Sequence, residues 1–309
     1  MGKTAFLFSG QGAQRAGMGK EFYEHFTSVR ALFDAAEELR PGTLQQMFAG
    51  SDDELRQTEN TQPCLYLADL AAAYALRDSG LQPEAVAGFS LGEIPALAFA
   101  GAYDALTGFR LACARGASMA RAGKNVNASM AAIVKLPDET VERLCAAYDH
   151  VWPVNYNCDG QIAVSGDRDE LERLYADVAA AGGRSMPLNV SGGFHSPYMD
   201  PASAEFGAIL ADTVLRKPTL PAYANRTAEP YGENVRELLT QQINHPVRWK
   251  ETLRHLNEQG FDTFVECGAG MVLCKLVRKN LPECRSFAVD SLAGLAKLQE
   301  EGMLCCSAT

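Results

Sequence analysis

The fold is decided by the stretch Ala85–Glu93, which reads AVAGFSLGE. A short apolar run leads into a glycine-flanked serine, and a helix-forming run, Ala96–Ala100, follows it. This G-x-S-x-G pattern is typical of a nucleophile elbow, a tight strand-to-helix turn in which glycines avoid side-chain clashes. It predicts that Ser90 presents its hydroxyl at a helix N-terminus, where unpaired N–H groups favour negative charge. A chance match in a glycine-rich loop is the alternative, and Pro95 predicts a loose or kinked helix start.

Two other predicted strands also end in glycine turns. Lys3–Phe8 leads into Ser9–Gly12, and Thr263–Cys267 leads into Gly268–Gly270. Apolar runs that alternate with helical patterns, such as the Ala-rich and Leu-rich Gln62–Arg77, indicate parallel strands joined by crossover helices. The predicted fold class is therefore α/β, with a parallel-sheet, hydrolase-like large domain. Because ligands bind beyond the carboxyl ends of such strands, all three glycine turns are expected at the edge that holds the site.

The middle of the chain has a different pattern, β-α-β-β-α-β, which is the order of a ferredoxin-like module. Its best-supported helix is Asp167–Ala181, because Asp167 can cap it and apolar residues recur at helical spacing. We therefore predict a ferredoxin-like small subdomain, residues 128–190, inserted into a large α/β domain of residues 1–127 and 191–309. The other expected elements are strands at Met130–Val134, Val151–Asn155, Gln161–Ser165 and Ser185–Val190, and a helix at Asp138–Tyr148.

Composition narrows the classes of function. The 309 residues carry a formal net charge of −10, which disfavours nucleic acid as a partner. No run of about 18 uncharged apolar residues indicates a membrane span, and the apolar run near the N-terminus is too short for a signal peptide. A cytoplasmic protein is therefore expected. The nine cysteines, including Cys305 and Cys306 in the tail, lack metal-like spacing, so reduced thiols and no metal site are expected.

A serine nucleophile requires a base, and the chain has five histidines. His195 lies in the loop Ser191–Pro197, where the chain leaves the small subdomain and a cleft between the domains would form. His245, followed by Pro246 in a predicted loop, is the rival candidate. A purely structural histidine at position 195 is the other interpretation.

The turn Gly10–Gly12 also has two interpretations. It is either a plain connection between a strand and a helix, or the source of a backbone N–H for an oxyanion, with a second N–H from Leu91. It lacks the lysine of a phosphate-binding P-loop and the third glycine of a dinucleotide fingerprint. Nucleotide binding by this turn is therefore not expected.

The chain resembles the malonyl-CoA:acyl carrier protein transacylases of fatty acid synthesis and the related acyltransferase domains of polyketide synthases. The resemblance covers nearly the whole chain, and the order and spacing of the shared motifs argue against chance. These motifs are Phe8–Gln14, Thr61–Pro63, Gly88–Glu93, Arg115–Gly116, Met130–Ile133, Asn155–Asn157, Gly193–Pro197, Pro246–Trp249 and Glu266–Gly270.

The resemblance implies a ping-pong reaction through a malonyl ester on Ser90, with His195 as the base. A backbone carbonyl, here that of Gln242, would orient the histidine in place of an aspartate. Arg115 would bind the free carboxylate of malonate, since a guanidinium fork holds a carboxylate at two points. A solvated helix arginine is the alternative at that position. The remaining implied roles are an oxyanion hole from the N–H groups of Gln11 and Leu91, and pocket positions at Gln62, Asn157 and Phe194.

The sequence departs from the family next to the nucleophile. The preceding residue is usually histidine in this family and is Phe89 here, which leaves pocket polarity and acyl choice open. Leu91 and Phe194 favour malonyl over methylmalonyl, because a bulky ring beside His195 would crowd a branch methyl. One methylene is worth only about 1–3 kcal/mol of such discrimination.

The expected partners are malonyl-CoA and an acyl carrier protein, with no metal or redox cofactor, and the family implies a monomer. An acidic carrier protein would dock on Lys275, Arg278 and Lys279, with Lys250 as a weaker candidate; a solvated helix face is the alternative. Three other functions stay open: a polyketide acyltransferase acting in trans, a serine esterase or thioesterase, and a carrier-binding module without activity.

Overall fold

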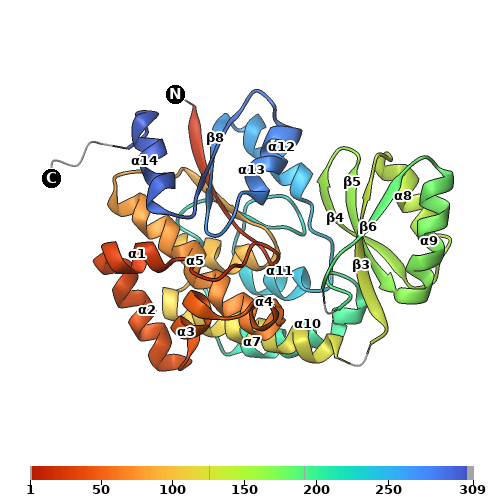
Figure 1. The fold of residues 1–309 in the computed structure, drawn as a ribbon, viewed down its shortest axis with the longest axis horizontal. Coiled ribbons are helices and arrows are strands. Elements are labelled where there is room, and N and C mark those ends of the chain that lie inside the picture. The colour runs from red at the N-terminus through yellow and green to blue at the C-terminus, as the bar shows by residue number, and fades with distance from the viewer. Residues whose placement is uncertain (1, 125, 191, 305–309) are drawn as a thin grey trace.

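The computed structural model describes residues 2–124, 126–190 and 192–304, so Cys305 and Cys306 lie outside the described residues. These residues form a five-stranded sheet in the order β7-β2-β1-β8-β9 and a four-stranded sheet in the order β4-β5-β3-β6 (Figure 1). The strands of the first sheet are β1 (Lys3–Phe8), β2 (Ala85–Gly88), β7 (Ala222–Tyr223), β8 (Phe261–Cys267) and β9 (Arg285–Val289).

Every strand pair in the five-stranded sheet is parallel, which confirms the α/β class predicted from the sequence. The register aligns the three strand ends that carry glycine turns, because Phe8 pairs with both Gly88 and Cys267. The turns after β1, β2 and β8 therefore meet at one edge of the sheet, as expected.

Helices surround the five-stranded sheet (Figure 1). None in the described ranges is both long and apolar enough to cross a membrane. The helices are α1 (Lys20–His25), α2 (Thr27–Leu39), α3 (Thr43–Ala49), α4 (Asp52–Arg56), α5 (Thr58–Asp78), α6 (Glu93–Phe99), α7 (Ala105–Gly123), α10 (Asp200–Ala211), α11 (Val235–Gln242), α12 (Trp249–Glu258), α13 (Val272–Asn280) and α14 (Leu292–Glu300), with 3₁₀ turns at Ser90–Gly92 and Pro197–Met199.

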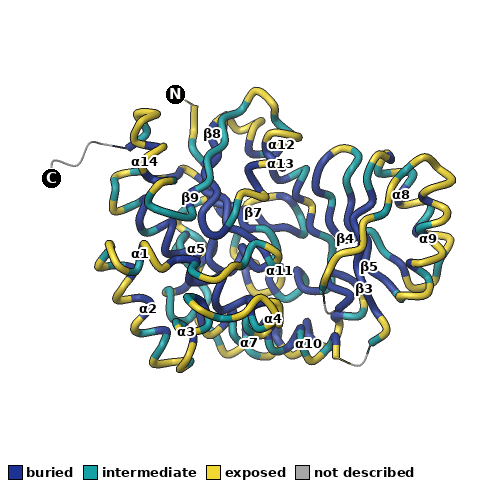
Figure 2. Tube along the Cα trace, in the orientation of Figure 1, coloured by how far each residue is buried: buried dark blue, intermediate teal, exposed yellow. Residues whose placement is uncertain are grey.

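Alternate residues of the central strands enter two separate cores, as expected for a sheet that is buried on both faces. Phe6 and Phe8 belong to the core shared with α5 and α6, whereas Leu7 and Phe264 belong to the core shared with α12 and α13. Figure 2 shows these central strands mostly in dark blue, with many of the exposed yellow segments on the outer helices and loops. The rigid double-faced sheet provides the support for the turns at its edge.

The small subdomain has the predicted element order. Its antiparallel strands and two helices share one core, which includes Ile133, Val141 and Leu171. Asp167 caps the second helix as predicted, accepting the N–H groups of the first turn. The elements are β3 (Ala128–Val134), α8 (Asp138–Cys145), β4 (Val151–Cys158), β5 (Gln161–Asp167), α9 (Arg168–Ala180) and β6 (Arg184–Pro187), all inside the predicted segment 128–190.

Three predicted ends in the small subdomain are wrong, and one of them is the end of β4, which continues to Cys158 rather than stopping at Asn155. The last strand ends at Pro187 rather than Val190, and the N–H of Leu188 still donates to the carbonyl of Met130 at 2.9 Å. The N–H of Val190 bonds instead to the carbonyl of Leu188 at 3.0 Å, which turns the chain. The first helix ends at Cys145 rather than Tyr148, since the N–H of Tyr148 closes a turn onto the carbonyl of Cys145.

The small subdomain joins the large domain through the edge of β4. The N–H of Tyr156 donates to the carbonyl of Val247 at 2.9 Å, and the N–H of Val247 donates to the carbonyl of Val154 at 2.8 Å. Lys250 on α12 forms ion pairs with Asp138 and Asp159 across the same junction. These bonds hold the small subdomain in one orientation relative to the large domain.

Candidate active site

The elbow at the end of β2 depends on its two glycines. A Cβ added at Gly88 would lie 1.9 Å from the carbonyl carbon of Gly92, and one added at Gly92 would lie 2.2 Å from the carbonyl oxygen of Phe8. Ser90, between them, has φ of 54°, the left-handed region that costs a non-glycine residue about 1–2 kcal/mol. The helix then begins with a 3₁₀ turn, Ser90–Gly92, which is the loose start predicted from Pro95.

Ser90 and His195 meet although they lie 105 residues apart in the chain. The Oγ of Ser90 lies 2.7 Å from Nε2 of His195, and Nδ1 of His195 lies 2.9 Å from the backbone carbonyl of Gln242. A carbonyl only accepts, so Nδ1 carries the proton and Nε2 is free to accept the serine proton. The rival His245 bonds through Nδ1 to the carbonyl of Gln241 at 2.8 Å.

His195 is nearly fully buried, and its backbone also has a positive φ of 61°. Burial, followed by the nearby charge of Arg115, lowers its pKa to about 4, while the hydrogen bond to Gln242 opposes the shift. The imidazole is therefore neutral at pH 7, which is the protonation state that a general base needs. Ser90 and His195 thus lie side by side in space, and both have strained backbone conformations, which is typical of a functional centre.

Arg115, on α7, is buried directly beside the nucleophile. One of its terminal nitrogens donates to the Oε1 of Gln62 at 2.9 Å, and the other donates to the Oε1 of Gln242 at 2.8 Å and to the Oγ of Ser90 at 3.2 Å. Burial lowers its pKa to about 10, so the guanidinium stays charged at pH 7. All three acceptors are neutral, so the positive charge faces the nucleophile without a hydrogen-bonded carboxylate.

The turn that carries Gln11 packs directly on the elbow. A Cβ added at Gly10 would lie 2.7 Å from the carbonyl oxygen of Phe89, so the two turns touch through their backbones. The side chain of Gln11 donates to the Oγ1 of Thr58 at 3.3 Å, and Leu91 is fully buried in the elbow. This contact places the two predicted oxyanion residues on adjoining turns; their role stays a prediction.

Phe89 packs against the core that contains α12 and α13. Its ring packs edge-to-face on Trp249, with centroids 5.3 Å apart. Together with Gln11 and Glu266 it lines a cavity of about 130 Å³. The apolar ring is thus part of the core around α12, and it makes this small cavity less polar than a histidine would.

The other predicted pocket residues fall into two groups. Gln62 bonds to Arg115, and Phe194 is buried next to His195 in the chain; their role as pocket residues stays a prediction. Asn157 is buried on β4, where its backbone carbonyl accepts from Asn280 at 2.9 Å. In the described part of the chain, no hydrogen bond links Asn157 to the nucleophile, the base or the arginine.

Sequence reasoning missed the residues beneath the elbow. Asn225 accepts the backbone N–H of Ser90 at 2.7 Å, and its own N–H donates to the Oε1 of Glu93 at 2.7 Å. Glu93 is fully buried, and burial raises its pKa to about 7 despite the hydrogen bonds from Asn225 and Tyr231. Only its position in the elbow motif pointed to Glu93, and nothing in the local pattern pointed to Asn225.

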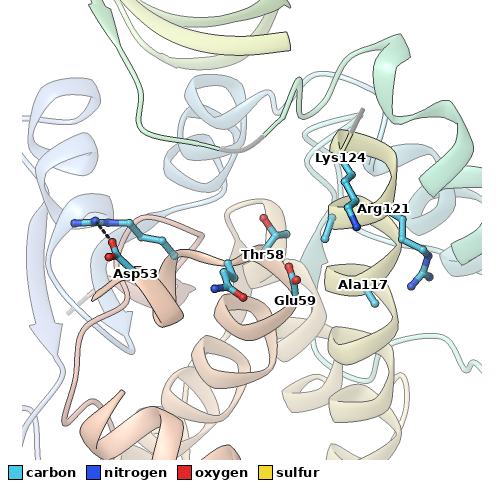
Figure 3. A pocket seen from close by; sticks show the side chains of 9 residues that line it. Asp53, Thr58, Glu59, Ala117, Arg121 and Lys124 are labelled. Carbon is cyan, nitrogen blue, oxygen red and sulfur yellow. Dashed lines mark hydrogen bonds and ion pairs between the residues drawn. The ribbon is translucent and has the colours of Figure 1, made fainter. Parts of the chain in front are cut away.

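A pocket of about 580 Å³ lies between the first turn of α5 and the last turns of α7 (Figure 3). Thr58 and Glu59 lie on one side of it, and Arg121 and Lys124 project from α7 on the other. Neither the nucleophile nor the histidine lines it. This pocket adjoins the site through Thr58, which bonds to Gln11. Its lining carries both acidic and basic side chains, and two of them, Asp53 and Arg56, form an ion pair.

Among the described residues, no group of three or more His, Cys, Asp or Glu side chains is placed to hold a metal ion. The polar groups that converge on Ser90 are a neutral imidazole, a guanidinium and amides. They can deprotonate the serine, bind an acidic group beside it and hold an acyl ester. The fold and site therefore define an α/β protein with a serine–histidine pair and a buried arginine.

The chain belongs to the acyl transferase domain family, which it matches over residues 5–306. It is 36% identical over 299 residues to the malonyl CoA-acyl carrier protein transacylase of Bacillus subtilis, covering 94% of both chains. The solved structure of malonyl CoA-acyl carrier protein transacylase from Clostridium perfringens superposes with a TM-score of 0.94 at 33% identity, covering 97% and 96% of the two chains. A malonyl-transacylase solved in complex with its type II PKS acyl-carrier protein has a TM-score of 0.92 at 32% identity, covering 97% and 99%.

Proposed function

We propose that this protein transfers the malonyl group from malonyl-CoA to the phosphopantetheine thiol of an acyl carrier protein, through a malonyl ester on Ser90. The observation that carries the proposal is the buried guanidinium of Arg115, 3.2 Å from the Oγ of Ser90 and bonded only to neutral acceptors. Malonate brings a second carboxylate that must be neutralised when it leaves water. A guanidinium at this distance from the nucleophile supplies that charge in a bidentate geometry.

The first half-reaction forms the ester. The Oγ of Ser90 attacks the thioester carbonyl while its proton passes to Nε2 of His195, and the carbonyl of Gln242 holds the resulting imidazolium. The oxyanion is stabilised by the N–H groups of Gln11 and Leu91. Collapse breaks the C–S bond, and the CoA thiolate takes the proton back from His195. The products are CoA and malonyl-Ser90.

The second half-reaction reverses these steps with a different thiol. His195 takes the proton of the phosphopantetheine thiol, and the thiolate attacks the Ser90 ester. The serine alkoxide that leaves is reprotonated by the histidine, so every proton is returned and no metal or redox cofactor is required. Proton transfer by a positioned base contributes about 10²–10⁴-fold, and one oxyanion donor about 10²–10³-fold, so the two effects are of similar weight.

Acyl selectivity depends on the walls next to the base. Phe194 and Leu91 are buried beside the dyad, which supports a preference for malonyl over a branched methylmalonyl group. The discrimination expected from one methyl is about 1–3 kcal/mol. Phe89 contributes an apolar wall to the neighbouring cavity rather than a contact with His195.

The carrier protein would dock on α13, whose last turn carries Arg278 and Lys279. Arg278 and Lys279 bond to neutral partners, the Oγ of Ser286 and the Oε1 of Gln161, so their charges stay available to an acidic surface. Lys250 is a poorer candidate, because Asp138 and Asp159 neutralise it. Met271 and Val272, each about half exposed at the other end of α13, would add apolar contact area. If raising salt from low to moderate leaves the apparent carrier affinity unchanged, this docking surface is excluded.

Intact-mass measurement after incubation with malonyl-CoA tests the proposed function. We expect one malonyl group on the wild-type chain, none on Ser90→Ala, and loss of the adduct when a phosphopantetheinylated carrier protein is added. Rapid release of free malonate without a carrier would instead favour a serine thioesterase. Carrier binding without any adduct would favour a non-catalytic module.

A second experiment asks whether the protein serves fatty acid synthesis or a polyketide pathway. A carrier protein from fatty acid synthesis and one from a polyketide pathway, offered in competition, distinguish a primary transacylase from a polyketide acyltransferase acting in trans. The complex of a similar malonyl-transacylase with a type II PKS carrier makes this comparison worth running. A cytoplasmic location and a monomeric state stay predictions.

A further inference from the structure

Asn225 lies directly under the nucleophile and has no place in the mechanism above. It is wholly buried and follows β7 by two residues. Strand β7 is only two residues long, but it pairs in parallel with β2, placing Tyr223 beside Ala87. The next residues of the two strands therefore run side by side, which brings Asn225 under the elbow that starts at Gly88.

The amide of Asn225 bonds to both sides of the elbow. Its Oδ1 accepts the backbone N–H of Ser90 at 2.7 Å, and its Nδ2 donates to the carbonyl of Gly88 at 2.6 Å. The Nε2 of Gln242 donates to the carbonyl of Ser90 at 2.6 Å. Both main-chain polar groups of the nucleophile are thus held by side chains from distant segments.

The pair of bonds from the Asn225 amide to Ser90 and Gly88, called the clamp below, acts on a strained residue. Ser90 has φ of 54°, and such a conformation persists only where the surroundings over-determine it. The direction of its side chain follows from that backbone conformation, and the Oγ is placed 2.7 Å from Nε2 of His195. A backbone that relaxed towards negative φ would move the hydroxyl off the imidazole.

The clamp is itself fixed from two sides. The N–H of Asn225 donates to the Oε1 of Glu93 at 2.7 Å, and its carbonyl accepts the N–H of Arg248 at 2.8 Å. The hydroxyl of Tyr231 donates to the same Oε1 of Glu93 at 2.8 Å. Because Asn225, Glu93 and Tyr231 are buried, the amide has one orientation that satisfies both its donor and its acceptor.

We propose that Asn225 is the positioning residue that holds Ser90 in the left-handed conformation and so aims its hydroxyl at His195. The proposal rests on Ser90 being the nucleophile of the proposed function. A side chain at this position must accept from the N–H of Ser90 and donate to the carbonyl of Gly88 at the same time. An amide does so at any pH, whereas a carboxyl group does so only when it is protonated.

The test uses Asn225→Ala and Asn225→Asp, with two readouts on the full chain. One is the single-turnover rate of Ser90 malonylation by malonyl-CoA, and the other is the rate at which phenylmethylsulfonyl fluoride modifies Ser90, both followed by intact mass. We expect Asn225→Ala to lower both rates by about 10²-fold, the effect of a misplacement of about 1 Å. The KM for malonyl-CoA should change far less, because Arg115 is untouched.

The pH profile of Asn225→Asp separates positioning from folding. At about pH 8 an ionised carboxylate faces the carbonyl of Gly88, and the rate relative to wild type should fall about 10²-fold. A buried carboxyl beside Glu93 holds its proton to higher pH than an exposed one, so the ratio should rise at least about tenfold on going to about pH 6. Glu93, Tyr231, Arg115 and His195 also face this amide, but they titrate in the wild type too and largely cancel in the ratio.

Asn257→Asp is the matched control, since its amide donates to a main-chain carbonyl, that of Phe261 at 3.1 Å, away from the elbow. Its rate relative to wild type should stay flat with pH. The proposal is overturned if folded Asn225→Ala reacts within threefold of wild type, if the Asn225→Asp ratio is flat with pH, or if neither variant folds. If phenylmethylsulfonyl fluoride modifies the wild type but malonyl-CoA does not, the proposed function fails. The rates at which the probe modifies the wild type and the Asn225 variants then still decide the role of Asn225.

Discussion

Hydrogen bonds that lie within the small subdomain and involve side chains join segments less than 30 residues apart, as two examples show, whereas those around Ser90 join distant segments. Tyr156 bonds to Glu142, 14 residues away, and Tyr148 bonds to Asp177, 29 residues away. The bonds from Ser90 to His195, Asn225 and Gln242 span 105, 135 and 152 residues. The first region is stabilised by local pairing, and the second exists only after the whole large domain has folded.

The difference concerns strain as well as sequence separation. Ser90 and His195 both have positive φ, and both are held by groups that come from other elements. A region assembled in this way is sensitive to small displacements, because a buried polar group that loses its partner leaves a costly unsatisfied donor or acceptor. Matched substitutions in the two regions should therefore differ sharply in effect.

The largest expected difference is between two histidines. His195→Ala should lower the single-turnover rate of Ser90 malonylation about 10²–10⁴-fold, since it removes the base. His150→Ala, at an exposed position in the small subdomain, should leave that rate within about twofold of wild type. Quenched reactions followed by intact mass give both rates. A His195→Ala rate above about one tenth of wild type would contradict the dyad.

The next pair compares glycines. Gly88→Ala places a Cβ 1.9 Å from the carbonyl carbon of Gly92 and should cost about 3 kcal/mol in the free energy of unfolding. Gly182→Ala, in the small subdomain, has φ of +86° but open space around its Cβ, so it should cost about 1 kcal/mol. Urea unfolding measures both. Equal costs would show that the elbow tolerates relaxation.

These regions also differ in how well the sequence predicts them. The G-x-S-x-G motif predicts the elbow because the requirement for glycine at position 88 comes from a contact with Gly92, four residues away. Asp167 and its helix are predictable for the same reason, since a cap acts on the next turn. Asn225 was not predictable, because its partners Ser90 and Gly88 become neighbours only through the pairing of β7 with β2.

The family resemblance supplied what local patterns lacked at the site. Arg115 lies on a helix whose pattern is equally compatible with a solvated arginine, and only the fold places it beside Ser90. The carbonyl of Gln242 carries no signal in a sequence, since every residue has one. The end of β6 at Pro187 was mispredicted for a simpler reason, because the apolar pattern continues to Val190 whereas the backbone turns there, with the N–H of Val190 bonded to the carbonyl of Leu188.

A moderate effect is expected on the pH profile of the base. Burial and Arg115 lower the pKa of His195 to about 4, so protonation removes the base only below that pH. The rate of Ser90 modification by phenylmethylsulfonyl fluoride should therefore be limited by His195 only below about pH 5, whereas a histidine with the ordinary value of about 6.5 would lose most of its activity there. A fall centred near 6.5 would contradict a buried, neutral imidazole.

The smallest effect is expected at the junction of the two regions. Lys250→Met breaks ion pairs with Asp138 and Asp159 that are partly open to solvent, and should cost about 1 kcal/mol or less in the free energy of unfolding. The rate of Ser90 malonylation should stay within about threefold of wild type. A larger loss of activity would mean that the small subdomain must be held by Lys250 for catalysis.

The most direct test of the central claim is the acyl preference of Arg115→Ala. Single-turnover acylation of Ser90 by malonyl-CoA and by acetyl-CoA is measured by intact mass for the wild type and the variant. Loss of charge-assisted hydrogen bonds worth about 1.5–3 kcal/mol predicts a fall of about 10–10²-fold with malonyl-CoA. With acetyl-CoA the rate should hold or rise, because that substrate has no carboxylate to bind. Equal losses with both substrates would contradict the assignment of Arg115 as the carboxylate clamp beside Ser90.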